Sequence, residues 1–216
     1  MGYTLDYPAS GDWLLTNKFY ELAGAACKKH TQAELRQAVD ESFAALSRHH
    51  LVRDTEAEWR QFAQFYGGLS ARLDLGLTEA AAREIARDRT FNMANYVLYP
   101  DTAEVLAALA KTHRLGVISD TWPSIEQQLQ TLGIRRYFSS TTYSSSLGTF
   151  KPDPRMYLDA LEKMGLPAGD TVFIDDLPRN LAGAAALGIT PILIAANPAS
   201  DVETPFYKIH ALKELL

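Results

Sequence analysis

Residues 172–180 of the chain read Val-Phe-Ile-Asp-Asp-Leu-Pro-Arg-Asn, an apolar run that ends in two adjacent carboxylates. A short apolar run of this kind is typical of a buried strand, and carboxylates at its end are costly to bury unless a positive group holds them. Ligands bind at the carboxyl edge of an α/β sheet, so Asp175 and Asp176 are candidate ligands of a divalent metal. The alternative interpretation is that they cap the next helix, because aspartate is a favoured N-cap.

The second half of the chain alternates short apolar runs with helical periods. We expect strands at 115–118, near 138–142, at 171–174 and at 191–195, with residues 209–212 as a last edge strand. We expect helices at 102–111, 124–132, 154–164 and 181–187, the last three ending at Gly133, Gly165 and Gly188. Strands that alternate with helices predict right-handed crossover units on a parallel sheet.

Residues 12–95 show helical periods only. Thr31 and Glu34 have the spacing of a capping box, and Thr78 is a candidate start of a later helix. We expect four helices and therefore a small bundle. Its aromatic stripe, which includes Trp59, Phe62 and Tyr66, favours a packed core over a cofactor site. The predicted organisation is an α/β core domain at 1–11 and 96–216, interrupted by a helical domain at 12–95.

Composition excludes several classes of protein. The 216-residue chain has a net charge of −5, which argues against bulk binding to nucleic acid or to an anionic membrane. Cys27 is the only cysteine, so there is no intrachain disulfide and no thiolate metal cage. Residues 1–12 show no secretory signal, and no run of eighteen apolar residues occurs. We therefore expect a cytoplasmic protein with no membrane or nucleic-acid partner, either a monomer or a homodimer.

Two further polar features follow predicted strands. Ser119 and Asp120 come directly after residues 116–118, and a hydroxyl with free backbone N–H groups at such a turn can hold a phosphate. Lys151 stands between Phe150 and Pro152, just before a helix that starts with proline. Taken singly, these are ordinary cap and loop residues. Taken with the double carboxylate, they predict a phosphate between Ser119 and Lys151, opposite a magnesium ion on Asp175 and Asp176.

Three of these stretches carry a family resemblance. Residues 117–120, 151–154 and 172–180 resemble motifs two, three and four of the haloacid dehalogenase-like hydrolases, and the chain is similar to their phosphoglycolate phosphatase-type subgroup. The resemblance implies a Rossmann-like, doubly wound parallel sheet with an inserted helical cap at 12–95. It also implies a Mg²⁺-dependent phosphatase that acts on a small phosphorylated metabolite through an aspartyl-phosphate, with the cap selecting the substrate.

The resemblance assigns a role to each motif residue. Ser119 and Lys151, together with the neighbouring Asp120, would form the phosphate site, and Lys151 would also neutralise the nucleophile. Asp175 would bind magnesium directly, and Asp176 would bind it directly or through water. The remaining residues are Gly2, whose carbonyl would be a third metal ligand, Asn180, which would orient the loop of motif four, and Thr4, which would steady the first loop.

The family's first motif, an apolar strand ending in Asp-x-Asp-x-Thr-Leu, is incomplete. Met1 to Leu5 match it from its second position onward, so the nucleophilic aspartate would lie directly before Met1. The strand that carries it lies in the middle of the family's sheet. Its loss removes about five buried side chains worth roughly 1.5–3 kcal/mol each, and leaves two strand edges facing an empty slot. We therefore expect that the natural protein starts upstream and that Met1 is an internal methionine.

Gly2 stands where the family has its general acid. A glycine supplies the carbonyl ligand, but losing a positioned acid–base group typically costs about 10²–10⁴ in rate. Two alternatives stay open. One is a 2-haloacid dehalogenase-like activity, because a halide leaving group needs no proton, although dehalogenases of this family do not use a metal. The other is a catalytically inactive member that binds a phosphorylated ligand or a partner chain supplying the missing strand.

Overall fold

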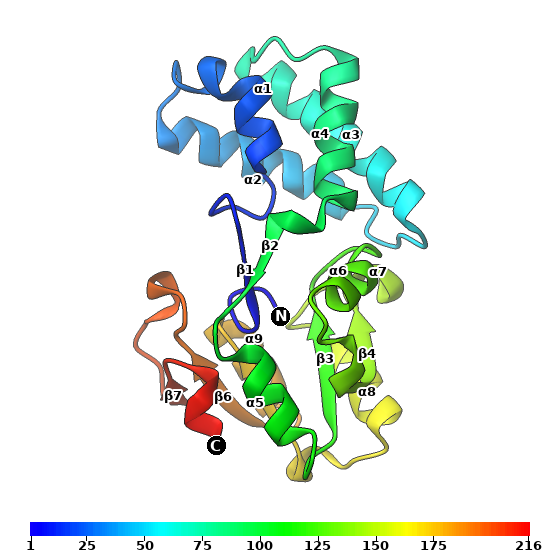
Figure 1. Ribbon diagram of the computed structural model, residues 1–216, viewed down its shortest axis with the longest axis vertical. Helices are drawn as coiled ribbons and strands as arrows, with labels where there is room; N and C mark the ends of the chain where they lie inside the picture. The colour runs from blue at the N-terminus through cyan, green and yellow to red at the C-terminus, as the bar shows by residue number, and fades with distance from the viewer. The chain divides into compact units, whose positions relative to one another are not determined.

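The computed structural model describes residues 1–216, which form two compact units. The α/β unit comprises Met1–Tyr7, Val97–Thr121 and Ile125–Leu216, and the helical unit comprises Pro8–Tyr96 together with Trp122–Ser124. Strands β1 (Asp6–Pro8) and β2 (Tyr96–Leu98) form a two-stranded sheet of their own (Figure 1).

The helical unit contains the four predicted helices. They are α1 (Asn17–Cys27), α2 (Gln32–Ser47), α3 (Thr55–Leu73) and α4 (Glu79–Phe91), and a 3₁₀ turn follows at Met93–Asn95 (Figure 1). Their N-caps accept hydrogen bonds from the first turn, and Thr31 and Glu34 form the predicted capping box. The core of this unit is aromatic and aliphatic, with Phe19, Phe62, Tyr66, Leu69 and Ile85 fully buried. The aromatic stripe is thus core, as predicted.

The α/β unit contains two parallel sheets. Strand β3 (Leu115–Ser119) pairs with β4 (Phe138–Tyr143), while β5 (Val172–Asp175) pairs with β6 (Thr190–Ile194), which pairs with β7 (Tyr207–Ile209). The helices are α5 (Thr102–Leu109), α6 (Ile125–Thr131), α7 (Ser144–Leu147), α8 (Pro154–Met164) and α9 (Pro178–Ala185). Short 3₁₀ turns lie at Arg135–Tyr137, Ala168–Asp170, Pro198–Ser200 and Leu212–Leu215.

Two local predictions need correction, and one helix was not predicted. Helix α9 begins at Pro178 instead of residue 181, because proline is well suited to the first helical position. The last edge strand is Tyr207–Ile209 instead of 209–212, because the Glu214 carboxylate accepts from the backbone N–H groups of His210 and Ala211 and starts a 3₁₀ turn. Helix α7 was not expected at all.

The parallel sheet is interrupted between β3 and β5. Strand β3 has β4 as its only partner, and β5 has β6 as its only partner, so the two sheets are not hydrogen-bonded to each other. This is the arrangement expected of a doubly wound fold whose central strand is missing. No helix of the structure has both the length and the apolar character needed to cross a membrane.

Gly183 on α9 permits a close approach to the loop that carries Lys151. A methyl group at Gly183 would lie 2.8 Å from the Cβ of Pro152 and 3.1 Å from the Tyr157 hydroxyl oxygen. We expect Gly183→Ala to lower the free energy of unfolding by about 1–3 kcal/mol, because this contact cannot be relieved without moving the proline ring. Gly67→Ala in α3 is the matched control: no atom lies within 4 Å of its methyl position. It should stabilise by about 0.5–1 kcal/mol. The measurement is the free energy of unfolding in urea. If both substitutions changed it in the same direction, the prediction would be wrong.

His50 makes the stability of the helical unit depend on pH. Its ring is buried edge-on against Trp122, with the centroids 4.7 Å apart, and burial lowers the pKa of His50 from 6.5 to about 4. The folded state therefore resists a proton that the unfolded state accepts. The contribution of the neutral His50 to the free energy of unfolding is complete above pH 6.5. It is lost as the pH falls toward 4, and the total loss is about 3 kcal/mol.

The check is urea unfolding at pH 7.5 and pH 4.5 in His50→Gln and His49→Gln. The exposed His49 is the control and should keep the wild-type pH dependence, while His50→Gln should show a clearly smaller loss. An identical pH dependence in both variants would rule out His50 as the cause.

Candidate active site

Lys151 joins the carboxyl ends of β3 and β5. Its Nζ donates to the backbone oxygen of Ile118 at 3.2 Å and to Oδ2 of Asp175 at 2.8 Å, and its backbone N–H donates to Oδ1 of Asp120 at 2.9 Å. Ser119 is buried at the end of β3. The structure therefore brings Ser119, Asp120, Lys151 and Asp175 to one edge of the interrupted sheet, with Ser119 and Asp175 at strand ends and Lys151 on the loop after α7.

The Lys151–Asp175 ion pair is almost completely buried, with side chains 5% and 3% exposed. Burial alone would raise the pKa of Asp175, but the adjacent Lys151 ammonium outweighs it and holds the pKa below its ordinary value. Burial alone would likewise lower the pKa of Lys151, and the carboxylates of Asp175 and Asp120 instead raise it. Both groups are therefore charged at neutral pH.

The second oxygen of Asp175 fixes the loop that follows β5. Oδ1 of Asp175 accepts from the Leu177 backbone N–H at 3.0 Å and from Nδ2 of Asn180 at 2.9 Å. The Asn180 carbonyl in turn accepts from the Tyr157 hydroxyl at 2.7 Å. Asn180 thus contacts the loop that it was predicted to orient, five residues after Asp175.

Asp176 is a buried carboxylate whose negative charge has no adjacent cation in a salt bridge. The Ser200 hydroxyl donates to its Oδ2 at a long distance of 3.4 Å. Burial, followed by repulsion from the Asp175 carboxylate, raises the pKa of Asp176. Two adjacent carboxylates that share one lysine carry an excess of negative charge, which a divalent cation would neutralise.

The chemistry of these donors fits magnesium. No group of three or more histidine, cysteine, aspartate or glutamate side chains lies together in the structure as a metal site. A magnesium ion here would instead take the two carboxylates, a backbone carbonyl such as that of Gly2, and oxygens of substrate and water. Magnesium is commonly held by one or two carboxylates with substrate oxygens completing the shell.

The first residues of the chain lie in the same cluster. The Met1 amine is buried, and burial lowers its pKa, as does the positive charge of Lys151, while Asp175, Asp6 and Asp176 oppose that change. The backbone oxygen of Met1 accepts from the N–H groups of Thr4 at 3.0 Å and Leu5 at 2.8 Å, which closes a tight turn. The first loop is therefore held by its backbone, and the buried Thr4 hydroxyl has no hydrogen-bond partner in the structure.

One expected role changes, and one buried carboxylate was not expected. Asp120 accepts from the Lys151 backbone, so it fixes the lysine loop, and burial raises its pKa. Asp6 was not a candidate, yet it is fully buried, accepts from Gln128 and has a pKa raised to about 6 by burial. No sequence pattern marked Asp6, because its burial depends on a helix 122 residues away in the chain.

Known proteins with similar sequences include both phosphatases and a dehalogenase. A glyceraldehyde 3-phosphate phosphatase of Methanocaldococcus jannaschii is 33% identical over 125 residues, which cover 55% of this chain and 54% of that protein. An (S)-2-haloacid dehalogenase 4A of Burkholderia cepacia is 25% identical over 190 residues, 82% of each chain. The chain spans about half the length of several of its curated relatives.

A solved structure supports the fold. The crystal structure of a HAD phosphatase from Thermococcus onnurineus matches with a TM-score of 0.67 at 21% identity, over 100% of this chain and 93% of that one. The family model of haloacid dehalogenase-like hydrolases matches residues 13–188. That match spans most of the helical unit and all three motif stretches of the α/β unit. The chain therefore belongs to the haloacid dehalogenase-like hydrolases.

Proposed function

We propose that the chain carries the phosphate and magnesium sites of a phosphatase that acts on a small phosphorylated metabolite. The reaction would proceed through an aspartyl-phosphate on an aspartate joined directly to Met1. The observation that carries the proposal is the position of the Met1 nitrogen, buried among the charges of Lys151, Asp175 and Asp176. A residue joined to that nitrogen would enter the same cluster.

Each polar or charged residue of the site then has a task in binding. The Lys151 ammonium, held by Asp175 and by the Ile118 carbonyl, would neutralise both the phosphoryl group and the attacking carboxylate. Ser119 would donate its hydroxyl to the phosphoryl group. Magnesium, bound by Asp175, Asp176 and the Gly2 carbonyl, would supply further charge neutralisation. The helical unit would select the substrate.

Relatives support the chemical class of substrate. Curated relatives include a glyceraldehyde 3-phosphate phosphatase and the phosphoglycolate phosphatase of Escherichia coli, which is 31% identical over 139 residues. Both names describe small phosphorylated metabolites, so we extend that class to this chain. The helical unit would determine which metabolite is bound.

Gly2 predicts slow turnover of the covalent intermediate. Glycine has no side chain to protonate the leaving group or to activate water, and such a group typically contributes about 10²–10⁴ in rate. Substrates with good leaving groups, such as p-nitrophenyl phosphate, should therefore be favoured, and the phosphorylated aspartate should accumulate before it is hydrolysed.

A second candidate function is dehalogenation of a 2-haloacid. It is favoured by Gly2, because a departing halide needs no proton, and by the relative from Burkholderia cepacia. The adjacent carboxylates Asp175 and Asp176 count against it, because Lys151 pairs with Asp175 only, and the remaining negative charge suits a cation that dehalogenation does not use.

The two functions are separated by extending the chain at Met1 with an apolar strand that ends in aspartate. We expect this protein to release phosphate from p-nitrophenyl phosphate with Mg²⁺, and EDTA or Asp175→Asn to reduce the rate by about 10²-fold or more. Asp40→Asn, an exposed change in the helical unit, should have no effect. EDTA-insensitive release of chloride from 2-chloropropionate, with no phosphate release, would instead select dehalogenation.

A further inference from the structure

A short segment of the chain is built into the helical unit, although both of its neighbours in the sequence belong to the α/β unit. Trp122–Ser124 is part of the helical unit, while Thr121 and Ile125 are part of the α/β unit. We call Trp122–Ser124 the anchor segment. It follows directly after Ser119–Thr121, which we call the phosphate loop because it contains two residues of the predicted phosphate site. One peptide bond therefore joins the phosphate loop to the helical unit.

The first residue of the anchor segment is buried in the core of the helical unit. Trp122 is only 4% exposed, and its ring packs edge-on against His50, with centroids 4.7 Å apart, and against Phe62, with centroids 5.0 Å apart. Its Nε1 donates to Oε1 of Gln61 on α3 at 3.0 Å. Because interiors are closely packed, a ring enclosed in this way moves only together with the residues around it. Trp122 is thus fixed to α3 by a hydrogen bond as well as by packing.

The last residue of the anchor segment is fixed to the same helix. The Glu58 carboxylate accepts from the Ser124 backbone N–H at 2.7 Å and from the Ser124 hydroxyl at 2.6 Å. Pro123, the residue between the two fixed ends, has a restricted φ and also restricts the backbone of the residue before it. The anchor segment therefore has little freedom to absorb a movement of α3 before that movement reaches the phosphate loop.

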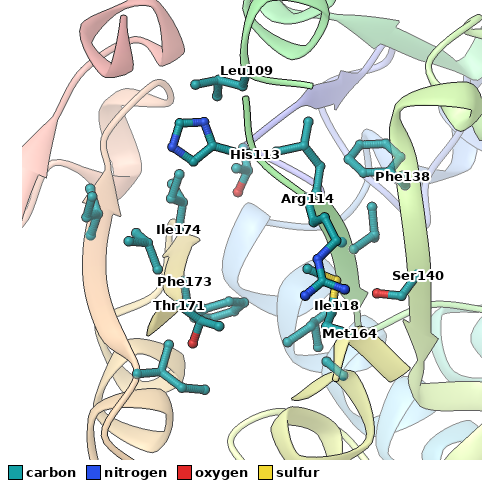
Figure 2. Close-up of a pocket in the computed structure, with 18 of the residues that line it drawn as sticks. Leu109, His113, Arg114, Ile118, Phe138, Ser140, Met164, Thr171, Phe173 and Ile174 are labelled. Carbon is teal, nitrogen blue, oxygen red and sulfur yellow. The ribbon is translucent and has the colours of Figure 1, made fainter. Parts of the chain in front are cut away.

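The phosphate loop is held from its other side by residues of the α/β unit. It follows Ile118, which lines the cavity shown in Figure 2 and whose carbonyl accepts from Nζ of Lys151 at 3.2 Å. The Thr121 N–H donates to Oγ of Ser144 at 2.7 Å, and the Ser144 hydroxyl donates to the Thr121 carbonyl at 3.1 Å. The backbone of Thr121 is thus fixed by Ser144, and the next residue in the chain is fixed by α3.

We propose that Gln61 and Glu58 are positioning residues for the phosphate loop and that they act through the anchor segment. If Trp122 or Ser124 is released from α3, the backbone of Thr121 gains freedom, and its hydrogen bonds with the α/β unit open more often. The order of the phosphate loop then depends on side chains of the helical unit. This coupling is a property of the fold, while its effect on phosphate binding rests on the proposed function.

The test is hydrogen exchange of single backbone amides in the 216-residue chain, followed by NMR. Gln61→Leu removes the acceptor of Trp122 and should speed exchange of the Thr121 N–H by about two- to tenfold, the range expected for one hydrogen bond. Exchange at Leu193, on β6 between β5 and β7, should stay unchanged. Gln61→Glu keeps an acceptor for Trp122 but not the donor to the His49 carbonyl, and it should restore the wild-type rate.

Two further variants test the other end and the specificity of the effect. Ser124→Ala removes one of the two hydrogen bonds to Glu58 and should also speed exchange at Thr121. Trp59→Phe is the matched control, because Trp59 also donates its indole N–H within the helical unit, to the Arg83 carbonyl at 3.1 Å. It should leave exchange at Thr121 unchanged, since Trp59 lies outside the anchor segment.

A side chain that only stabilised the helical unit would not change exchange in the phosphate loop. The proposal is therefore overturned if Gln61→Leu leaves the rate at Thr121 unchanged, or if it speeds exchange at Leu193 equally. It is also overturned if Gln61→Glu behaves like Gln61→Leu, or if Trp59→Phe has the same effect as Gln61→Leu.

Binding of inorganic phosphate distinguishes the positioning role from the proposed function. By calorimetry we expect phosphate to bind Gln61→Leu about two- to tenfold more weakly than it binds the wild type or Gln61→Glu. Equal affinity in all three proteins would overturn the positioning role. If the wild type binds no phosphate but the exchange rates change as expected, the coupling is upheld and the phosphatase is rejected.

Discussion

Replacing Lys151 by methionine is expected to lower the free energy of unfolding by about 3–5 kcal/mol, because it leaves a buried carboxylate without its cation. Asp175 is nearly inaccessible and lies directly beside a second buried carboxylate, Asp176. The Lys151 ammonium donates to Oδ2 of Asp175 at 2.8 Å, and methionine offers no donor in its place. The measurement is the free energy of unfolding in urea at pH 7.

Two further variants identify the cause. Lys163→Met removes a lysine that pairs with Asp159 but is 44% exposed, and it should cost less than about 1 kcal/mol. The double variant Lys151→Met, Asp175→Leu removes both charges of the buried pair and should recover a large part of the loss. A cost for Lys151→Met no greater than that for Lys163→Met would contradict a buried ion pair at the centre of the site.

The helical unit holds a second buried charge whose loss should have a comparable effect. Glu58 is fully buried and accepts from Nη1 of Arg89 at 2.9 Å, from the Ser124 backbone N–H at 2.7 Å and from the Ser124 hydroxyl at 2.6 Å. The Arg89 guanidinium also lies 3.7 Å from the centre of the Phe62 ring. We expect Arg89→Met to destabilise by about 3–5 kcal/mol at pH 7.

The pH dependence of this loss has a defined sign. Burial already raises the pKa of Glu58 above its ordinary value, and removal of Arg89 would raise it further. A carboxyl whose folded pKa is raised gains stability as pH falls through that pKa, because the folded state then takes up a proton more readily than the unfolded state. The difference in the free energy of unfolding between wild type and Arg89→Met should therefore be smaller at pH 5 than at pH 7.

Exposed and isosteric variants complete this test. Arg83→Met breaks a surface pair with Glu79 and should change stability by less than about 1 kcal/mol at either pH. Adding Glu58→Gln to Arg89→Met should restore part of the stability and remove the narrowing with pH. A loss for Arg89→Met that stays constant with pH would show that lost packing on Phe62, and not the charge of Glu58, is responsible.

Elements with strong local signals were predicted closely from the sequence. Helix α8 has its observed bounds because Pro154 marks its first turn and Gly165, at φ 60°, its end. The capping box at Thr31 was equally local. Strand β7 was displaced and helix α7 was missed, because an edge strand of three residues and a helix of four carry too little periodicity to be located.

The sequence predicted which residues belong to the candidate site, but not which of them contact each other. Residues that end parallel strands meet at one edge, so Ser119 and Asp175 could be grouped from their positions alone. Lys151 is separated from the end of β4 by helix α7, so its position along the chain is a weaker signal. That Lys151 and Asp175 contact each other depends on the packing of a loop across 24 residues of sequence. The burial of Asp6 and the Glu58–Arg89 pair also depend on contacts between distant segments, and the helical pattern gives no sign of either.

The most direct test of the central claim is a search for the covalent intermediate. The chain is extended at Met1 by an apolar strand ending in aspartate, incubated with p-nitrophenyl phosphate and Mg²⁺, and analysed by intact mass and peptide mapping. We predict the addition of one phosphoryl group on the aspartate joined to Met1, accumulating because Gly2 provides no side chain to activate water. An unmodified aspartate under conditions in which phosphate is released, or a phosphoryl group on another residue, would contradict the claim.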